Sequence, residues 1–343
     1  MSPKAVSFGE VMLRLSPPGF ERFLQSPAFC ATFGGAEANV AVSLAQFGVE
    51  SWFVSRLPAH AIGEAAIKAL RADGVRTDAI ARGGDRIGIY YAEAGASQRA
   101  SNVIYDRAHS AISDIGADAI DWPRIMIGAG WFHLTGITPA LGPRAHAAAE
   151  AAIAAARTAG ARLSVDLNFR KKLWTEAQAQ AVMRPLVRGF DLIIANEEDL
   201  QSVLGVHVPN ADVRAGALDL AGYQAAAEQV SREFNVGLVA VTLRESASAS
   251  DNGWSGALWD ASTQTFHAGQ RYDVRLVDRI GGGDSFAGGL IFGLLTGRPP
   301  EAALRFAIAA SALKQSIPGD FSRISVEEVD RLAGGDASGR VQR

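Results

Sequence analysis

Apolar and polar positions along the chain follow two periods that alternate over most of its length. Short, mostly apolar runs, some with apolar residues at every second position, predict β-strands. Longer segments with apolar residues three or four positions apart predict amphipathic helices; within 36–48, for example, Val40, Leu44 and Phe47 fall on one face. We expect strands at 5–15, 51–56, 86–91, 103–107, 131–135, 163–167, 192–195 and 237–242. We expect helices at 36–48, 62–73, 144–160, 224–234 and 285–295.

This alternation of strands and helices predicts an α/β fold, in which a doubly wound, mostly parallel sheet has helices on both faces. In such sheets, ligands bind where the carboxyl ends of the strands meet. Three of the expected strands end in polar clusters, which comprise Asp166, Asn168 and Arg170; residues 196–199; and Thr242, Arg244 and Glu245. The sequence therefore predicts a binding site at this edge of the sheet.

The composition limits the class of protein. With 343 residues, of which 48% are hydrophobic, the chain is long enough for one large α/β domain. Its 33 basic and 36 acidic residues give a net charge of −3, which argues against a nucleic-acid-binding protein. The single cysteine, Cys30, excludes an internal disulfide and suits a reducing cytosol. We see no signal-peptide pattern and no membrane-spanning apolar run, so we expect a cytoplasmic protein without a membrane partner.

The strongest functional signal is the segment 278–289, which reads D-R-I-G-G-G-D-S-F-A-G-G. Three consecutive glycines predict a tight turn, and the residues from Ser285 onward predict a helix. A glycine turn that leads into a helix favours bound anions, because unpaired N–H groups and the helix dipole both attract negative charge. The acid beside this turn, Asp284, is suited to take a proton from a hydroxyl that attacks a phosphoryl group. We therefore expect phosphoryl transfer, with Gly281, Gly282 and Gly283 as the anion hole and Asp284 as the general base.

A second motif, F-G-G-A-E-A-N-V-A, occupies 33–41. Gly34 and Gly35 precede an expected helix and Asn39 lies in its first turn, where N–H donors are available to ligand hydroxyls. The two motifs, in this order, resemble the N-terminal and C-terminal signatures of the PfkB, or ribokinase-like, carbohydrate kinases. The D-R-x-G-G-G-D-S-F form is similar to the branch that phosphorylates 2-keto-3-deoxygluconate (KDG). The resemblance covers residues 5–330.

The resemblance implies a single kinase domain, 1–333, that uses ATP and Mg²⁺ to phosphorylate a small sugar acid, KDG, at its terminal hydroxyl, O6. The domain would comprise a core (1–9, 35–85 and 109–333) and a small β-sheet lid (10–34 and 86–108), followed by a disordered tail, 334–343. Tyrosine and arginine side chains suit the acid end of the sugar, because arginine pairs bidentately with carboxylates. The implied sugar-binding residues are Gly34, Gly35, Asn39, Tyr90, Tyr105, Arg107, Ile137, Arg170, Asp284 and Asp320.

The resemblance also implies a nucleotide site. Its residues would be Asn168, Arg170, Asn196, Thr242, Arg244, Ser246, Gly281 and Gly283. Glu198 and Asp199 resemble family acids that organise magnesium through water, so no direct metal ligand is expected. The segment from Thr242 lacks the glycine-bearing T-x-G-x-x-G of many relatives, and Arg244 would supply a charge in its place.

Two other functions remain open on the sequence: a kinase of a neutral sugar, such as fructose or ribose, and a non-catalytic sugar sensor on the same fold. An oxidoreductase is disfavoured because the first strand is not followed by a dinucleotide-binding G-x-G-x-x-G. The sequence does not decide between the gluconate and galactonate epimers. An exposed lid sheet tends to pair with another sheet, so we expect a homodimer through the lids.

Overall fold

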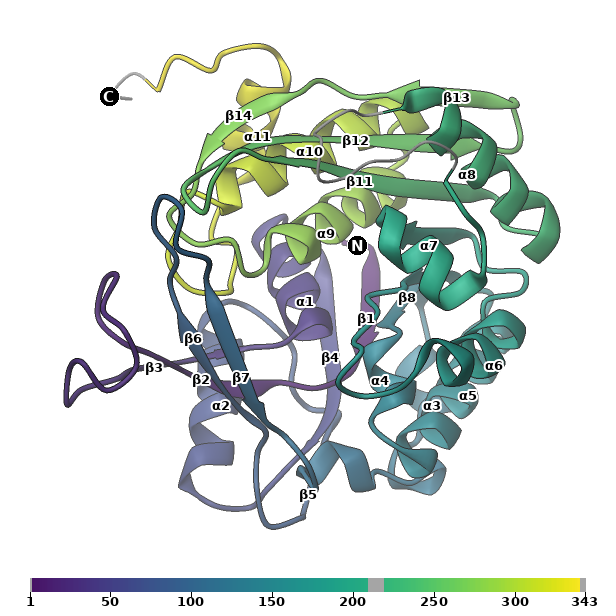
Figure 1. The fold of residues 1–343 in the computed structure, drawn as a ribbon. Coiled ribbons are helices and arrows are strands. Elements are labelled where there is room, and N and C mark those ends of the chain that lie inside the picture. Colours follow the sequence, from purple (N-terminus) through teal and green to yellow (C-terminus); the bar gives the residue numbers. More distant parts are fainter. Residues whose placement is uncertain (1, 209–218, 340–343) are drawn as a thin grey trace.

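The computed structural model describes residues 2–208 and 219–339 (Figure 1). Within these ranges, ten strands form one large sheet. Their order is β13 (Thr265–Ala268), β12 (Asp251–Asp260), β11 (Leu238–Ser246), β10 (Leu192–Ala195), β9 (Arg162–Asp166), β8 (Ala129–Thr135), β1 (Lys4–Phe8), β4 (Glu50–Leu57) and β5 (Ile80–Arg82), with β14 (Tyr272–Arg275) paired to β12. The strands from β11 to β5 are parallel to their neighbours, whereas β12, β13 and β14 are antiparallel additions at one edge. The predicted mostly parallel sheet is confirmed.

The chain order of the parallel strands reverses beside β1. Strands β4 and β5 lie on one side of β1, whereas β8 to β11 follow one another on its other side. A reversal of this kind opens a crevice at the carboxyl ends of the strands. The register places Thr135, the last residue of β8, opposite Asp166, the last residue of β9. The predicted polar clusters therefore meet at one edge.

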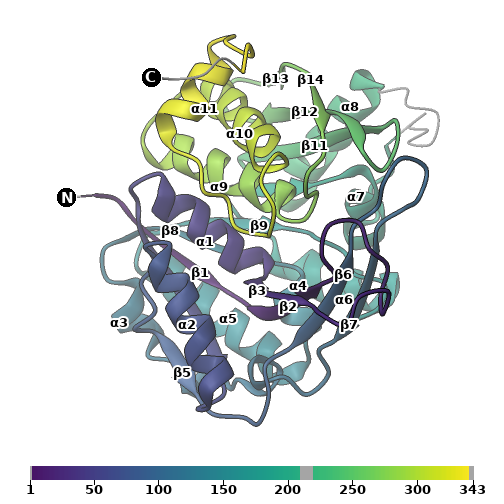
Figure 2. The ribbon, with the colours of Figure 1, turned by 90° about the vertical axis from the view of Figure 1, so that its left-hand side faces the viewer.

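Helices cover both faces of the large sheet, and for this reason its central strands are mostly buried; β10 is apolar throughout. One face carries α1 (Ala36–Gln46), α2 (Ala61–Ala72), α9 (Gly282–Leu295), α10 (Pro300–Lys314) and α11 (Val326–Ala333), as Figure 2 shows. The other face carries α3 (Trp122–Met126), α4 (Ile137–Ala140), α5 (Pro143–Thr158), α6 (Glu176–Leu186), α7 (Glu197–Leu204) and α8 (Leu220–Phe234), with the 3-10 turns η1 (Ala111–Asp114) and η2 (Ala117–Ala119). Helix α9 packs between α1 and α10, which fixes the direction of its N-terminus.

The small sheet consists of β3 (Cys30–Gly34), β2 (Met12–Ser16), β6 (Ile89–Glu93) and β7 (Asn102–Asp106) in that order. It projects from the core next to the carboxyl end of β1 (Figure 1). The loop between β6 and β7 touches the β11–β12 turn, where the N–H of Ala249 donates to the carbonyl of Ser97 (2.7 Å). The N–H of Ser97 donates in turn to the hydroxyl of Ser250 (2.9 Å). We call this sheet the lid.

Two local predictions are wrong. The expected strand 5–15 is two strands in different sheets, because the chain turns at 9–11 and buries the carboxylate of Glu10. The expected triple-glycine turn is a single turn residue, Gly281, since Gly282 and Gly283 already belong to α9. The backbone of Gly281 is left-handed (φ 85°), and a side chain there would collide with the carbonyl of Asp320.

Two further features concern predictions about the chain as a whole. None of the helices in the described ranges has the length and apolar character needed to cross a membrane. The expected tail, 334–343, has neither helix nor strand up to residue 339, and residues 340–343 lie outside the described residues.

Candidate active site

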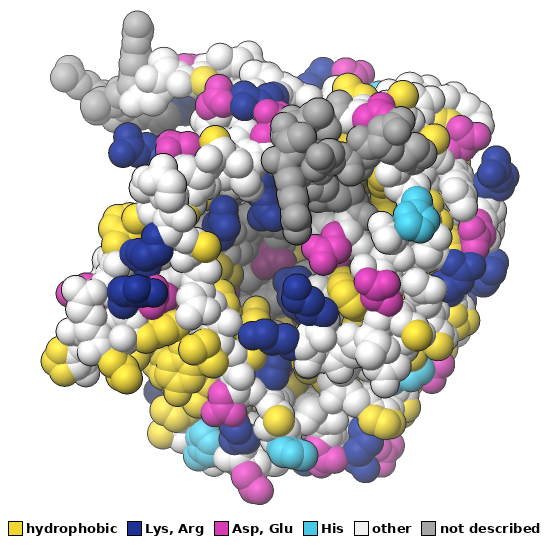
Figure 3. All heavy atoms as spheres, in the orientation of Figure 1, with side chains coloured by type: hydrophobic (Ala, Val, Ile, Leu, Met, Phe, Trp, Pro, Cys, Tyr) yellow, Lys and Arg dark blue, Asp and Glu magenta, His cyan; other side chains and the backbone are white. Residues whose placement is uncertain are grey.

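A cavity of about 450 Å³ lies where the carboxyl ends of β8 to β11, the N-terminus of α9 and the lid converge. Figure 3 shows it as a hollow on the face seen in Figure 1, with acidic colour in its depth and basic side chains around its rim. Most of the predicted site residues line it: Gly35, Asn39, Tyr90, Tyr105, Arg107, Ile137, Asn168, Arg170, Asn196, Glu198, Asp199, Thr242, Arg244, Gly281, Gly282, Gly283, Asp284 and Asp320. The structure thus brings the sugar and nucleotide predictions together in one cavity.

Two predicted residues, Gly34 and Ser246, are not in the lining. Gly34 ends β3, and a side chain there would collide with the carboxylate of Asp320, so its part is to let that acid approach. Ser246 ends β11 and lines a separate hollow beside Arg271 and Asp273. The structure therefore gives no support for Ser246 as a nucleotide contact.

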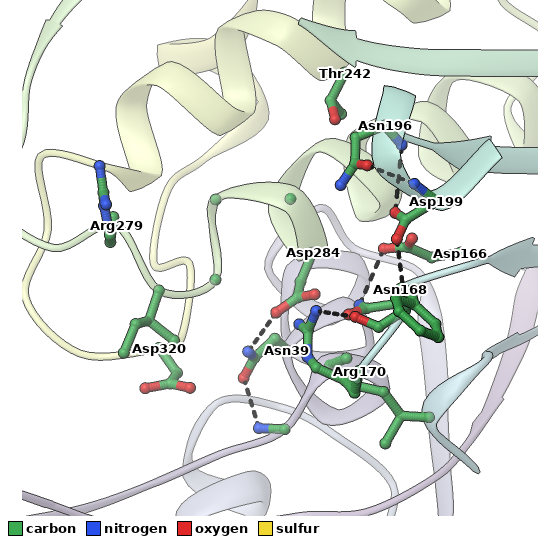
Figure 4. Close-up of a pocket in the computed structure, with 18 of the residues that line it drawn as sticks. Asn39, Asp166, Asn168, Arg170, Asn196, Asp199, Thr242, Arg279, Asp284 and Asp320 are labelled. Atoms are coloured by element: carbon green, nitrogen blue, oxygen red, sulfur yellow. Dashed lines mark hydrogen bonds between the residues drawn. The ribbon is translucent and has the colours of Figure 1, made fainter. Parts of the chain in front are cut away.

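Asp284 lies in the first turn of α9 and faces the cavity (Figure 4). Its Oδ2 accepts a hydrogen bond of 2.6 Å from the side-chain amide of Asn39, whose Oδ1 accepts in turn from the N–H of Gly35 (3.3 Å). Removal from water raises the pKa of Asp284 to about 7, although the Asn39 bond and the charge of Arg170 lower it. A carboxyl group with a pKa near neutrality is suited to accept a proton at physiological pH.

The N-terminus of α9 is open to the cavity. No side chain caps it. The N–H of Gly282 donates to the carbonyl of Arg279 (3.4 Å), and the next N–H groups, at Gly283 and Asp284, have no helical acceptor. A side chain at Gly283 would meet no atom within 4 Å, which shows free space in front of this turn. The hydroxyl of Ser311 holds the turn from behind by donating to the carbonyl of Gly282 (2.7 Å). The geometry is that of an anion site at a helix N-terminus.

Acids and amides from β9 and α7 form the opposite wall. Asp166 accepts from the amide of Asn168 (3.3 Å), and burial together with the charges of Asp199 and Asp284 raises the pKa of Asp166 well above its usual range. Burial also raises the pKa of Asp199 to about 6. The Oδ1 of Asn168 is buried without a hydrogen-bond partner among the described residues, and its backbone is left-handed (φ 43°), which asparagine tolerates. This wall therefore brings acids and amides to the cavity, with one buried amide oxygen left without a partner.

Asp199 also has a structural task. Its Oδ1 accepts from the N–H of Phe169 (2.8 Å), and its Oδ2 accepts from the N–H of Asn196 (3.4 Å) in the capping box that begins α7. Its carboxylate therefore fixes the segment that carries Asn168 and Arg170. Glu198 is exposed at the rim of the cavity.

The two arginines predicted to bind the sugar acid lie in different surroundings. Arg107 is buried and forms an ion pair with buried Glu10, which also accepts from the hydroxyl of Ser110 (2.8 Å). Its charge is thus compensated within the protein, and it lies 5.5 Å from the ring of Tyr105. Arg170 is exposed at the rim, and among the described residues its side chain donates only to the carbonyl of Phe169 (3.1 Å). Arg170 is therefore the freer of the two to meet an anion.

Asp320 is buried at the lid side of the cavity. Its carboxylate accepts from the hydroxyl of Tyr90 at 2.6 Å and pairs with Arg14 at 2.8 Å. Arg14 also pairs with Asp278 at 2.7 Å. Two lid strands, β2 and β6, thus contact the segments before α9 and after α10 through these side chains. The contacts fix Asp320 and leave lone pairs of its carboxylate for a ligand hydroxyl.

The sequence did not indicate four polar residues at or beside the cavity: Arg14, Glu37, Arg279 and Lys314. It placed Asp166 at the binding edge of the sheet but assigned it no role. Glu37, which accepts from the hydroxyls of Thr135 (2.7 Å) and Thr138 (2.6 Å), is buried behind Asn39 on α1. Arg14 gave no local signal, because its partner Asp320 is 306 residues away.

The comparisons with known proteins agree with this geometry. The sequence model of the pfkB family carbohydrate kinases matches residues 2–321. The chain belongs to this family, and it is therefore a phosphotransferase that acts on a carbohydrate.

Particular relatives narrow the class. The chain is 49% identical to the crystal structure of a 2-dehydro-3-deoxygluconokinase from Thermotoga maritima, with a TM-score of 0.93 over 97% of this chain and 100% of that one. It is 34% identical to a 2-dehydro-3-deoxygalactonokinase from Haloferax volcanii, over 98% of this chain and 99% of the relative. A fructokinase from Xylella fastidiosa with bound ATP shares the fold, at 21% identity and a TM-score of 0.76 over 97% of this chain and 99% of that one.

Proposed function

We propose that the protein is an ATP-dependent kinase that phosphorylates KDG, the sugar acid also called 2-dehydro-3-deoxygluconate, at O6. The observation that carries the proposal is Asp284, a cavity carboxyl with a pKa of about 7 at the open N-terminus of α9. Arginine and tyrosine side chains on the same cavity supply groups that recognise an acid. The names of the Thermotoga maritima and Haloferax volcanii relatives support a 2-keto-3-deoxy sugar acid as the substrate.

In the proposed reaction, the O6 hydroxyl attacks the terminal phosphoryl group of ATP. The carboxylate of Asp284 takes the hydroxyl proton, the O6–phosphorus bond forms, and the bond from phosphorus to the leaving oxygen of ADP breaks. Asn39 orients Asp284 through its 2.6 Å bond, and the N–H groups at the start of α9 bind the oxygens of the phosphoryl group. Closure of the lid over the cavity would exclude water, which prevents hydrolysis of ATP.

The cavity also fits the nucleotide. Its unsatisfied groups, the N–H donors of α9, the buried Oδ1 of Asn168 and the exposed guanidinium of Arg244, are donors and acceptors that a polyphosphate and a purine would use. Bound Mg²⁺ would neutralise charge between the phosphates, and Glu198, Asp199 and Asp166 are the carboxyl groups that would hold it through water. A cation would also lower the free-energy cost of placing these acids close together.

For the sugar acid, we assign the carboxylate to the side of the cavity formed by Tyr105, Arg107 and Arg170. These residues also line a neighbouring hollow with Lys171 and Lys172, so this side carries an excess of basic groups. Asp320 would accept hydrogen bonds from the sugar hydroxyls, and the amide of Asn39 could both accept and donate them. Ile137, which is buried at the start of α4, would contact the apolar C3 of a deoxy sugar.

A neutral-sugar kinase is the second candidate, because one observation favours it. Glu10 already compensates the charge of Arg107, so binding of an acid rests mainly on Arg170. The fold itself does not distinguish the two candidates, since the Xylella fastidiosa fructokinase shares it.

The test is ADP release with Mg-ATP and KDG, its galactonate epimer, gluconate, fructose or ribose. The proposal predicts that kcat/KM for one or both 2-keto-3-deoxy acids exceeds the values for fructose and ribose. Turnover of a neutral sugar alone would establish the second candidate, and binding of KDG without ADP release would indicate a sensor. The ratio of kcat/KM for KDG to kcat/KM for its galactonate epimer decides which of the two acids is the preferred substrate.

We also propose that two lids associate in a homodimer. Both outer strands, β3 and β7, have mainly exposed residues, and Ile104 of β7 is 47% exposed. Phe20 and Leu24, on the β2–β3 loop, are 57% and 85% exposed. Unpaired strand edges flanked by apolar side chains favour association. Light scattering after gel filtration should give twice the chain mass, and Ile104→Lys should give the chain mass; a wild-type monomer would contradict the proposal.

A further inference from the structure

Arg279 is a half-buried arginine at the cavity, and nothing within the described ranges compensates its charge. It precedes the turn residue Gly281 by two positions and Asp284 by five, and its side chain lines the cavity. Its Nε is buried without a hydrogen-bond partner, and it forms no ion pair within 4.0 Å in the described part of the chain. Burial and the nearby Arg244 both lower the pKa of Arg279, although an arginine stays charged in proteins.

Two acids at the lid side of the cavity, Asp278 and Asp320, form no ion pair with Arg279. Asp278 and Asp320 both pair with Arg14, and the ammonium of buried Lys314 lies close enough to interact with the two carboxylates. Two acids and two basic groups therefore balance one another in this cluster. Arg279 is left without an acid, since the charged group that acts on it is Arg244, and a half-buried charge without a partner costs free energy until an anion binds.

The backbone around Arg279 is held firmly. The N–H of Asp278 donates to the carbonyl of Gln315 (3.2 Å), and the N–H of Ile280 donates to the carboxylate of Asp278 (3.1 Å). The carbonyl of Arg279 accepts from Gly282 (3.4 Å). The guanidinium therefore stands on a fixed segment beside the anion site, which reduces the reorganisation needed during a reaction.

The position of Arg279 selects one anion among those that a sugar-acid kinase would bind. The carboxylate of KDG is five carbon–carbon bonds from O6, so it lies away from Asp284 when O6 is in place to react. In Figure 4 the guanidinium of Arg170 lies beside the carboxylate of Asp284, whose pKa its charge lowers, whereas Arg279 lies apart from both. An anion that meets both Arg279 and the N-terminus of α9 would therefore be a phosphate group of the nucleotide and not the carboxylate of the sugar acid.

From these observations we propose that Arg279 is a catalytic residue that binds the transferring phosphoryl group and stabilises the charge on its oxygens in the transition state. This rests on the proposed function only in that a phosphoryl group is transferred at Asp284. An arginine on the same chain would supply here what other phosphotransferases obtain from an arginine aimed at the phosphoryl group. Lysine would replace it only partly, because the planar guanidinium can bond two oxygens at once.

The test uses the full chain with Arg279→Gln and Arg279→Lys. Arg275→Gln is the matched control, since Arg275 is an exposed arginine at the end of β14, four residues earlier. The wild type is assayed first on the sugar panel above, and the variants are then compared on whichever sugar it phosphorylates. Failure of the KDG proposal is thus seen in the wild type, and failure of the Arg279 proposal is seen in the variants.

We expect Arg279→Gln to lower kcat by about 100-fold to 1,000-fold, with Arg279→Lys intermediate and Arg275→Gln at the wild-type value. The KM for the sugar should not change. A second readout, calorimetry with ADP, Mg²⁺ and the sugar, with and without aluminium fluoride as a mimic of the phosphoryl group, does not depend on turnover. Arg279→Gln should bind ADP as the wild type does but lose the tighter binding with aluminium fluoride.

Three results would overturn the proposal. A normal kcat would show that Arg279 is dispensable. Equal loss of affinity for ADP with and without aluminium fluoride would place the side chain on the phosphates that stay with ADP. A raised KM for the sugar acid at constant kcat would place it on the carboxylate. If Arg279→Gln fails to fold, as judged by its Tm, Arg279→Lys supplies the same comparison.

Discussion

Replacing Asp284 by asparagine should stabilise the folded protein while it removes turnover. Asparagine has nearly the same shape, keeps an oxygen that accepts from Asn39, and carries no charge. In the folded protein the pKa of Asp284 is raised from 3.8 to about 7, because ionisation in the cavity is poorly solvated. A difference of about three pKa units corresponds to about 4 kcal/mol of cost for the ionised form.

Proton linkage gives the direction in which the stability of the wild type changes with pH. Between pH 4 and pH 7, the folded protein holds a proton on Asp284 that the unfolded chain has lost, so the stability of the wild type falls as pH rises through this window. The Asp284→Asn variant lacks this dependence. Its gain in unfolding free energy over the wild type should therefore be larger at pH 8 than at pH 5, by about 2 kcal/mol after allowance for partial exposure.

Urea unfolding of both proteins at pH 5 and pH 8 measures this gain. Asp118→Asn, an exposed position on η2, is the control and should give no pH-dependent gain. An Asp284→Asn variant that is no more stable than the wild type at pH 8 would refute the raised pKa. A gain of equal size at both pH values would show that it arises from packing and not from ionisation.

Three further predictions concern other residues of the cavity. Asn39→Leu removes a hydrogen bond to the carboxylate of Asp284, so the acid limb of the pH profile of kcat/KM should move to higher pH by about 1 unit. The control, Ser43→Ala on the same helix, should leave that limb in place. Arg170→Ala should move that limb in the same direction and raise KM for a sugar acid without changing Tm, since Arg170 is exposed; an unchanged KM would remove it from acid binding. Arg107→Ala should lower stability by about 3 kcal/mol in urea unfolding, because it leaves Glu10 buried and unpaired; wild-type stability would contradict this.

The periodic pattern predicted the fold well, since strands such as 192–195 are apolar throughout and the helices carry clear apolar faces. It was less successful where an element carries an unusual local sequence. Gly282 and Gly283 lie in α9 despite the poor helix propensity of glycine. Glycine is suited to position 282 because a side chain there would crowd Gln315, and glycine at 283 leaves the N-terminus of the helix open. The strand expected at 5–15 failed because a continuous apolar pattern does not show where the chain crosses from one sheet to another.

The candidate site also contains residues that the sequence predicted and residues that it did not. Asp284 and Asn39 belong to motifs, so their types and order were sufficient to predict them, although 245 residues separate them. Arg14 and Arg279 were not predicted, because what distinguishes them is the presence or absence of a partner in space. The pairing of Arg107 with Glu10 was invisible for the same reason, and it changes what Arg107 contributes.

The proposed function depends most directly on Asp284 as the base for transfer to a sugar acid. A rapid-quench, single-turnover measurement with labelled ATP and KDG isolates that step for the wild type and for Asp284→Asn, after the affinities for ATP and KDG have been measured by calorimetry. We predict labelled KDG 6-phosphate from the wild type, and equal affinities but transfer slower by about 100-fold to 10,000-fold in the variant. Transfer at the wild-type rate in Asp284→Asn, or wild-type enzyme that leaves KDG unlabelled, would contradict the account.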